Sequence, residues 1–247
     1  MDTLITLFNL ILYQPLLNIL VFFYNIIPGH DVGIAIIFLT IIIRLLLLPL
    51  SRKSIKSQKD MQELQPEMNK IKEKYKQDRV KQSQALMQLY KDKRISPMGS
   101  CLPLLIQLPI LIALYRVFIS GLGNNLEALY PFIHHPETIN PYFLGLIDLS
   151  KTHNFVLALI AGGLQFIQSK MMLPSKSKMA QGGKQADMSK MMNTQMTYFM
   201  PLITVWFAWA FPAGLALYWA VTTLFTIIQQ RVMMKGKENR KQITDNG

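Results

Sequence analysis

Five apolar runs constrain this chain more than any other feature of its sequence. They lie at residues 32–50, 101–121, 154–170, 197–211 and 214–231. Several of them approach the ~17–25 residues that an α-helix needs to cross a bilayer. The sequence therefore predicts an all-α integral membrane protein with a five transmembrane helix core, and not a soluble domain around one large core.

Lysine and arginine are distributed very unevenly between the polar segments. Segment 51–97 holds 13 of the 26 basic residues and segment 231–247 holds 5, whereas segment 1–31 holds none. Cytoplasmic loops of membrane proteins carry the excess of these residues. The N-terminus is therefore predicted outside and the C-terminus in the cytoplasm. We attribute the net charge of +12 to this bias and to anionic lipids as partners, and expect no direct nucleic-acid recognition.

Nothing near the start of the chain resembles an organellar targeting sequence. No segment rich in arginine and serine precedes the first apolar run. A multi-pass protein of the bacterial plasma membrane is therefore expected.

Residues 1–30 are expected to form an N-terminal interfacial amphipathic helix. Polar residues at positions 2, 6, 9, 14, 18 and 25 form a stripe at helical spacing on each side of Pro15. This pattern fits a kinked helix that lies in the outer membrane interface. The segment is also long enough to cross a bilayer, so a sixth span is the alternative.

Residues 51–97 predict a cytoplasmic helical hairpin. Apolar residues at positions 61, 64, 68, 71 and 75 step by three and four, as on one helical face, and Gln77-Asp78 marks the turn. The charged faces suit either the region of the anionic headgroups or a docking partner. Residues 171–196 are predicted to be a flexible cytoplasmic loop, and residues 236–247 a basic cytoplasmic tail.

Arg44 stands inside the first apolar run, in the stretch IIFLTIIIRLLLLPL. None of the 14 Asp and Glu residues lies inside a predicted span, so Arg44 has no counter-ion within the membrane. A guanidinium keeps its charge at any accessible pH. Arg44 therefore needs water or a transient partner, unless its side chain snorkels to the cytoplasmic interface.

Neutral polar residues occur at a similar depth in the other apolar runs: Gln107, Gln165, Gln168, Thr222 and Thr226. Individually, such residues most often form hydrogen bonds between helices. Together with Arg44 they indicate a hydrated groove that opens toward the cytoplasm. The four histidines fall on the outer side, and adjacent His134 and His135 cannot share one helical face. We therefore expect no metal and no cofactor.

Three long stretches resemble the YidC/Oxa1/Alb3 membrane protein insertases: IIIRLLLLPLSRKS, KRISPMGSCLPLLIQLPILIALY and FPAGLALYWAVTTLFTIIQQ. The resemblance covers residues from about 30 to 235. It implies that residues 31–235 form a five-helix insertase core with Arg44 in its substrate groove. It also implies that Thr40 and Tyr218 belong to this groove.

The sequence departs from the family pattern in several places. From the residues given, we expect a member without the large extracytoplasmic domain that some relatives carry and without the long basic tail of others. Thr222-Thr223 stand where relatives often carry asparagine, so the groove is expected to be less polar there.

The expected function is that of an insertase and chaperone for membrane proteins, which catalyses no covalent reaction. Nascent membrane proteins are the partners that the resemblance implies, together with the Sec translocon and the ribosome. A small-anion transporter or channel with Arg44 as its binding site is the alternative. A third possibility is a structural assembly factor in which Arg44 only snorkels.

Overall fold

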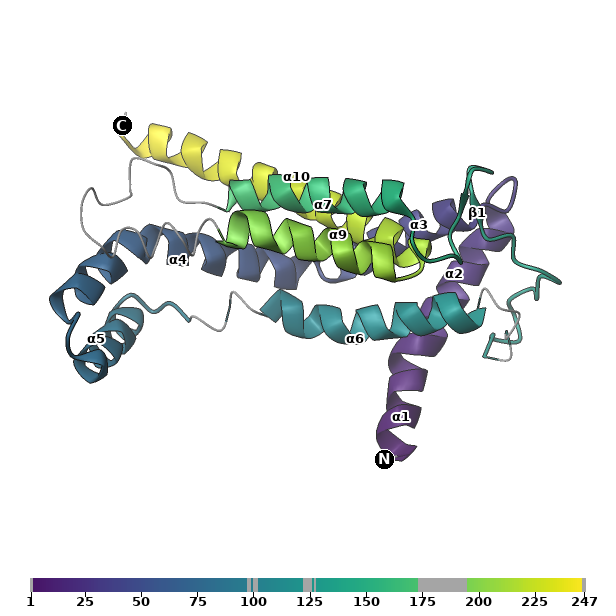
Figure 1. The fold of residues 1–247 in the computed structure, drawn as a ribbon, viewed down its shortest axis with the longest axis horizontal. Helices are drawn as coiled ribbons and strands as arrows, with labels where there is room; N and C mark the ends of the chain where they lie inside the picture. The colour runs from purple at the N-terminus through teal and green to yellow at the C-terminus, as the bar shows by residue number, and fades with distance from the viewer. Residues whose placement is uncertain are drawn as a thin grey trace.

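The computed structural model describes residues 2–96, 99, 102–121, 126, 128–172 and 195–245, and this part of the chain is mostly helical (Figure 1). The elements in chain order are α1 Asp2–Phe8, the π-helical turn η1 Asn9–Tyr13, α2 Gln14–Ile26, α3 Val32–Leu46, α4 Leu48–Lys74, α5 Arg79–Asp92, α6 Leu102–Arg116, the π-helical turn η3 Val117–Gly121, strands β1 Tyr142–Phe143 and β2 Ile147–Asp148, α7 Phe155–Met171, the π-helical turn η5 Gln195–Phe199, α9 Met200–Ala210 and α10 Ala213–Asp245.

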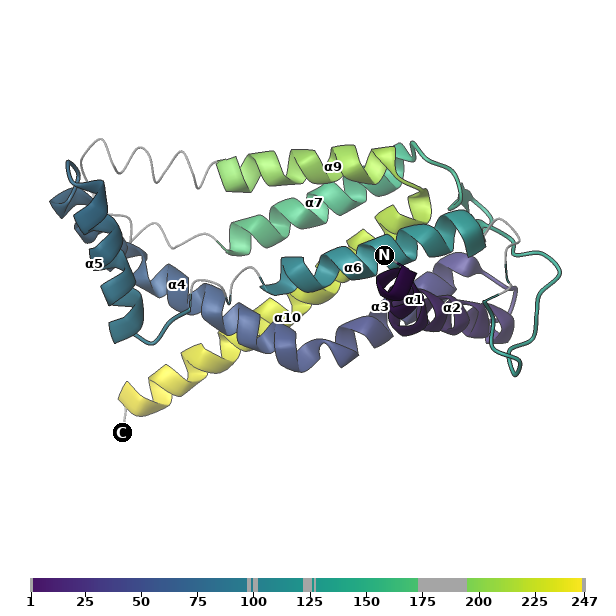
Figure 2. The ribbon, with the colours of Figure 1, turned by 90° about the horizontal axis from the view of Figure 1, so that it is seen from below.

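Helices α7, α9 and α10 form the closely packed part of the bundle, and α3 packs against α10. A Cβ atom on Gly162 of α7 would lie 2.2 Å from the Val205 Cγ2 atom of α9, so only glycine allows this approach. Helix α6 contacts α10 and, toward one end of the bundle, η1 and α2 (Figure 2). We call this end, which carries residues 126–153, the loop end, and the opposite end, which carries α4 and α5, the hairpin end.

The N-terminal segment is one continuous helix from Thr3 to Ile26. It continues through Pro15, which lacks a backbone N–H, and the π-helical turn η1 ends at Tyr13, two residues before this proline. Figure 1 shows the segment crossing the loop end at a steep angle to α6, α7 and α9. The orientation in the figure fits an interfacial helix, but its place relative to a bilayer stays a prediction.

Asn18 ties the N-terminal helix to the loop end. Its side chain is 2% exposed and donates to the carbonyl of Ala128 at 3.0 Å. It also accepts from the backbone N–H of Tyr130 at 2.6 Å. Asn25, on the same helix, donates to the carbonyl of His134. The polar stripe seen in the sequence thus partly contacts protein instead of water.

The first predicted span ends earlier than its apolar run. Residues 32–50 were expected to form one helix, but α3 ends at Leu46 and α4 begins at Leu48, with a bend of 68° between them. Pro49 lies in the first turn of α4, where its missing N–H costs no helical hydrogen bond. The proline therefore belongs to the start of α4 and does not end α3.

Helices α4 and α5 pack against each other at the hairpin end. The Asp78 side chain caps α5 by accepting from the N–H of Lys81. Lys93 of α5 lies 2.9 Å from the carboxylate of Glu67, and Tyr90 contacts the sulfur of Met68. Within the predicted loop 171–196, residues 173–194 lie outside the described part of the chain, and helix α10 continues through most of the predicted tail 236–247.

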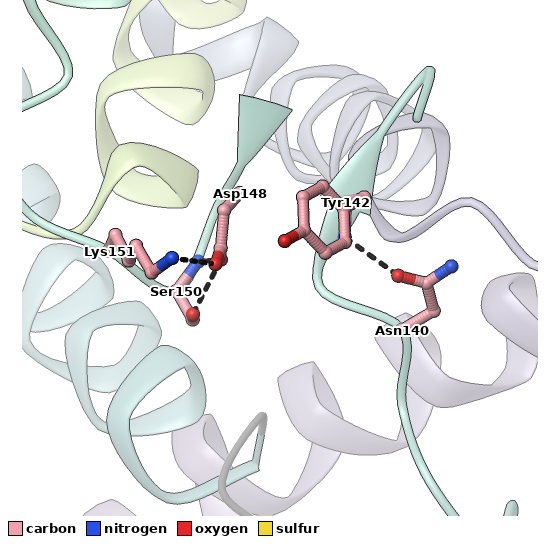
Figure 3. A network of polar contacts seen from close by, with 5 residues as sticks. All are labelled: Asn140, Tyr142, Asp148, Ser150 and Lys151. Carbon is pink, nitrogen blue, oxygen red and sulfur yellow. Dashed lines mark hydrogen bonds and ion pairs between the residues drawn. The ribbon is translucent and has the colours of Figure 1, made fainter. Parts of the chain in front are cut away.

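A two-stranded antiparallel sheet of β1 and β2 covers the start of α3. Asp31 caps α3 through Ile34 and also accepts from the N–H of Leu144, which fixes the sheet to the helix. Figure 3 shows Asp148 of β2 with its partners Ser150 and Lys151. Burial alone would raise the pKa of the Asp148 carboxyl, but the contacts with Ser150 and Lys151 hold this pKa below its usual value.

Helices stand at each of the five predicted span positions; α3, α6, α7 and α9 are short, whereas α10 has 33 residues. Among the residues that the structure describes, Thr3–Ile26 is the one single helix found long and apolar enough to cross a membrane, and α3 with α4 qualifies only as a bent pair. The apolar parts of the next three helices, Leu105–Ile119, Phe155–Met171 and Thr197–Ala210, are shorter. That five helices cross the bilayer therefore stays a prediction.

Candidate functional site

Arg44, in the last turn of α3, reaches toward α6 near the hairpin end. Its Nη2 atom donates to Oε1 of Gln107 over 3.5 Å, at the long limit of a hydrogen bond. Its Nε atom is buried and has no hydrogen-bond partner among the described residues. The guanidinium is thus half-buried with one long contact to a neutral amide.

No acidic group compensates this charge within the described residues. The three ion pairs found there join Lys81 to Asp78, Lys93 to Glu67 and Lys151 to Asp148, all outside the apolar helices. A charge inside a membrane helix costs about 2.5–3.5 kcal/mol on insertion scales at the centre, and less near the interface. The folded chain therefore carries a partly uncompensated cation at this place.

Gln107 links Arg44 to the last helix. Its Nε2 atom donates to the Tyr218 hydroxyl at 2.7 Å, which leaves its Oε1 atom facing Arg44. Tyr218 is 1% exposed, so its ring is fixed by the packing of α10 against its neighbours. The contact chain Arg44–Gln107–Tyr218 therefore joins α3, α6 and α10, and a common substrate groove around it stays a prediction.

The same face of α10 continues toward the hairpin end with Thr222 and Thr226, one and two turns after Tyr218. The Thr226 hydroxyl donates to the carbonyl of Thr222 at 2.9 Å. The Thr222 hydroxyl is buried and finds no partner in the described part of the chain. Thr222 and Thr226 thus lie on the same face of α10 as Tyr218, and the Thr222 hydroxyl has free hydrogen-bonding capacity within the described chain.

Thr40 is positioned differently from the other members of the predicted set. Its side chain is fully buried, and its hydroxyl donates to the carbonyl of Ile36 in the same helix at 2.6 Å. A threonine in a membrane helix commonly satisfies its hydroxyl in this way. Thr40 is close to Arg44 in the helix, but its donor is already used.

Gln165 and Gln168 are not joined to Arg44 by a hydrogen bond in this structure. Both are half-buried on α7, which packs against α9 and α10. The depth that suggested them in the sequence says nothing about which face of α7 carries them. Their place in a common groove therefore stays a prediction.

Sequence reasoning missed a further polar contact, which joins α4 to α10. Gln229 donates to the Ser51 hydroxyl at 2.7 Å. Nearby in sequence, the Ser54 hydroxyl and the Gln230 Oε1 atom are buried without a partner in the described chain. In the sequence, Gln229 and Gln230 are polar residues that follow the threonines of this helix, but nothing there indicates Ser51 as a partner.

A metal site finds no support in the part of the chain that the structure describes. No group of three or more His, Cys, Asp or Glu side chains there could hold an ion. Together, the helical fold and the polar contacts around one arginine define a class of protein: an apolar helical bundle with a polar site between its helices.

The family is established by comparison with known proteins. Residues 22–241 match the family model described as the 60Kd inner membrane protein, and this chain belongs to that family, which contains the YidC insertases. Membership in the YidC/Oxa1 family, expected from the three motifs, is therefore confirmed.

Similar proteins are described as membrane protein insertase YidC. The protein from Geotalea daltonii is 38% identical over 225 residues, which are 91% of this chain and 37% of that protein. The one from Magnetococcus marinus is 35% identical over 229 residues, 92% of this chain and 36% of its own length. This chain thus spans little more than a third of the length of these relatives.

A solved structure is also similar. It is described as an active YidC insertase crystal structure with the first transmembrane domain resolved. The likeness has a TM-score of 0.57 at 28% identity and covers 90% of this chain and 46% of that chain. The helical arrangement is therefore shared with a member of the family.

Proposed function

We propose that this protein is a membrane protein insertase in which Arg44 attracts an acidic segment of the substrate into a hydrophilic groove. The observation that carries the proposal is the state of Arg44: one 3.5 Å contact to Gln107, a buried Nε atom without a partner and no ion pair within the described residues. The names of the similar proteins support the same activity.

The mechanism needs no covalent step. A carboxylate 4 Å from a guanidinium gains about 4 kcal/mol at an effective dielectric constant of 20, before its own desolvation is counted. This gain is of the size needed to offset the cost of drawing a short polar segment into the membrane. Once the apolar helix of the substrate partitions into lipid, the attraction is released because the polar segment continues to the outer side.

The remaining predicted residues have supporting roles in this proposal. Gln107, Tyr218, Thr222 and Thr226 keep the groove polar next to Arg44, and Gln165 and Gln168 extend it along α7. Thr40 keeps α3 closely packed one turn before the arginine. Five spans, an outer N-terminus and a cytoplasmic C-terminus complete the arrangement, with nascent membrane proteins as substrates and the Sec translocon, the ribosome and anionic lipids as partners.

The proposal is tested with purified protein in liposomes. The substrate is a single-span protein with a short outer tail that carries two aspartates, and a second version carries asparagines instead. We expect Arg44→Ala to slow insertion of the aspartate substrate about tenfold, equivalent to about 1.4 kcal/mol. Arg44→Lys, which keeps the charge, retains much of the rate.

Lys170→Ala is the matched control, because Lys170 is an exposed basic residue near the end of α7 that stacks on Phe166. It should leave both rates unchanged. An Arg44→Ala protein that inserts the aspartate substrate at the rate of the unaltered protein would show that the charge has no role. Chloride or phosphate flux that depends on Arg44 would instead favour an anion transporter.

A further inference from the structure

Arg116 is an exception to the distribution of basic residues in this chain. It ends α6 at the loop end, which the lysine and arginine bias predicts to face outward. The proposed insertion mechanism makes no use of it. A basic residue that stands against the charge bias, inside an apolar helix, calls for a local physical reason.

The π-helical turn η1 surrounds the Arg116 side chain. Its Nη1 atom donates to the side-chain carbonyl of Asn9 at 2.7 Å. Its Cζ atom lies 5.0 Å from the centre of the Tyr13 ring and 5.9 Å from that of Phe8. A π-helical turn closes hydrogen bonds over five residues, so Phe8 and Tyr13 come to one side of the helix.

These contacts orient the guanidinium of Arg116 but do not neutralise its charge. Cation–π contacts with two rings contribute about 0.5–2 kcal/mol each. Asn9 is a neutral acceptor that uses one of the five N–H donors of the guanidinium. No acidic side chain pairs with Arg116 within the described residues. The charge is thus held in place with donors to spare.

The depth of Arg116 identifies the anion that is available. The five residues of η3 separate Arg116 from the end of the apolar run at residue 121, so Arg116 lies roughly 8 Å along the helix from that end at the 1.5 Å rise of an α-helix. A long arginine side chain covers this distance by snorkelling. The abundant anionic group at that level of a bilayer is the phosphate of a phospholipid.

We propose that Arg116, oriented by Phe8, Asn9 and Tyr13, binds the phosphate group of a phospholipid in the outer leaflet. The planar guanidinium matches two phosphate oxygens in bidentate geometry. Apolar side chains on the adjoining helix, namely Leu4, Leu7, Leu10 and Ile11, are exposed and are suited to contact the acyl chains of the same lipid. The site would hold the N-terminal helix against the membrane at the loop end.

Lipid binding to the purified full chain in detergent tests the site, with native mass spectrometry as the readout. Dioleoyl phosphatidylglycerol is titrated against the unaltered protein and against Arg116→Gln, Arg116→Lys and Lys151→Gln. We expect Arg116→Gln to bind the lipid about tenfold more weakly, since a charge-assisted hydrogen bond is lost. Arg116→Lys keeps the positive charge but lacks the two parallel N–H donors of a guanidinium, so its affinity for the lipid should be intermediate. Lys151→Gln should bind the lipid as tightly as the unaltered protein.

Two further arms identify the ligand group. A diacyl glycolipid without phosphate should bind the unaltered protein and Arg116→Gln equally, and inorganic phosphate at millimolar concentration should not displace phosphatidylglycerol. Equal binding of phosphatidylglycerol by the unaltered protein and Arg116→Gln would overturn the proposal. The same holds if Arg116→Gln loses the glycolipid to the same extent, because the residue would then only maintain the fold.

Discussion

Two arginines stand in apolar helices of this protein, and their surroundings differ. Arg116 at the loop end is enclosed by two aromatic rings and an asparagine at 2.7 Å. Arg44 has one contact of 3.5 Å and a buried nitrogen without a partner in the described chain. The folded protein fixes the orientation of the Arg116 guanidinium, whereas Arg44 is held by one long contact and keeps a buried donor without a partner in the described chain. A charge that the fold leaves uncompensated is one that a passing ligand can stabilise.

The largest expected effect comes from giving Arg44 a permanent counter-ion. Gln107→Glu places a carboxylate of the same shape where the amide oxygen now lies 3.5 Å from the guanidinium. The internal ion pair would compete with the acidic segment of the substrate, so we expect insertion of the aspartate substrate to slow at least about tenfold. Insertion kinetics in liposomes measure this effect.

Gln107→Leu is the control for this substitution, because it removes the same amide without adding a charge. It should slow insertion by a smaller factor than Gln107→Glu. Equal rates for the two variants would mean that Arg44 is not the group with which the substrate interacts.

A second comparison concerns stability and should give opposite signs for the two arginines. Arg44→Leu removes a poorly compensated charge and should raise the free energy of unfolding by about 1–2 kcal/mol. Arg116→Leu removes two cation–π contacts and a hydrogen bond and should lower this free energy by about 1–2 kcal/mol. Thermal unfolding in detergent measures both, and shifts of the same sign would contradict the contrast between the two sites.

The smallest effect is expected from Tyr218→Phe. The change removes the hydroxyl that accepts from Gln107 at 2.7 Å and leaves the buried ring in place. The amide can then rotate, so we expect a loss of about 1 kcal/mol, seen as a few-fold slower insertion. If Gln107 acts through Arg44, adding Tyr218→Phe to the Arg44→Ala protein should not slow insertion further. A double-mutant cycle measures the coupling.

Much of the candidate site was predictable because helical spacing and depth are local properties. Depth in the apolar runs grouped Arg44, Gln107 and Thr222, and the family resemblance added Tyr218; the structure joins Arg44, Gln107 and Tyr218 in one contact chain. The internal hydrogen bond of Thr40 was not foreseen, since the sequence does not say which acceptor a hydroxyl takes. Likewise, the depth of Gln165 and Gln168 in the sequence does not say which face of α7 carries them.

The long-range contacts could not be read from the chain. Arg116 and Asn9 are 107 residues apart, and Asn18 meets the loop end across 110 and 112 positions. Neither residue type specifies its partner, because an amide and a guanidinium can each form hydrogen bonds with many different groups. The bend after Leu46 did have a signal, since Pro49 is favourable in the first turn of a new helix.

By itself, the sequence determined that this protein is helical, apolar and asymmetric in charge. These properties follow from composition and periodicity, which act on each segment separately. Only the tertiary structure decided that Arg116 is enclosed by aromatic rings while the buried Nε atom of Arg44 stays without a partner in the described chain. The physical reason is that charge compensation depends on distances between helices, and these distances are set by the packing of the whole bundle.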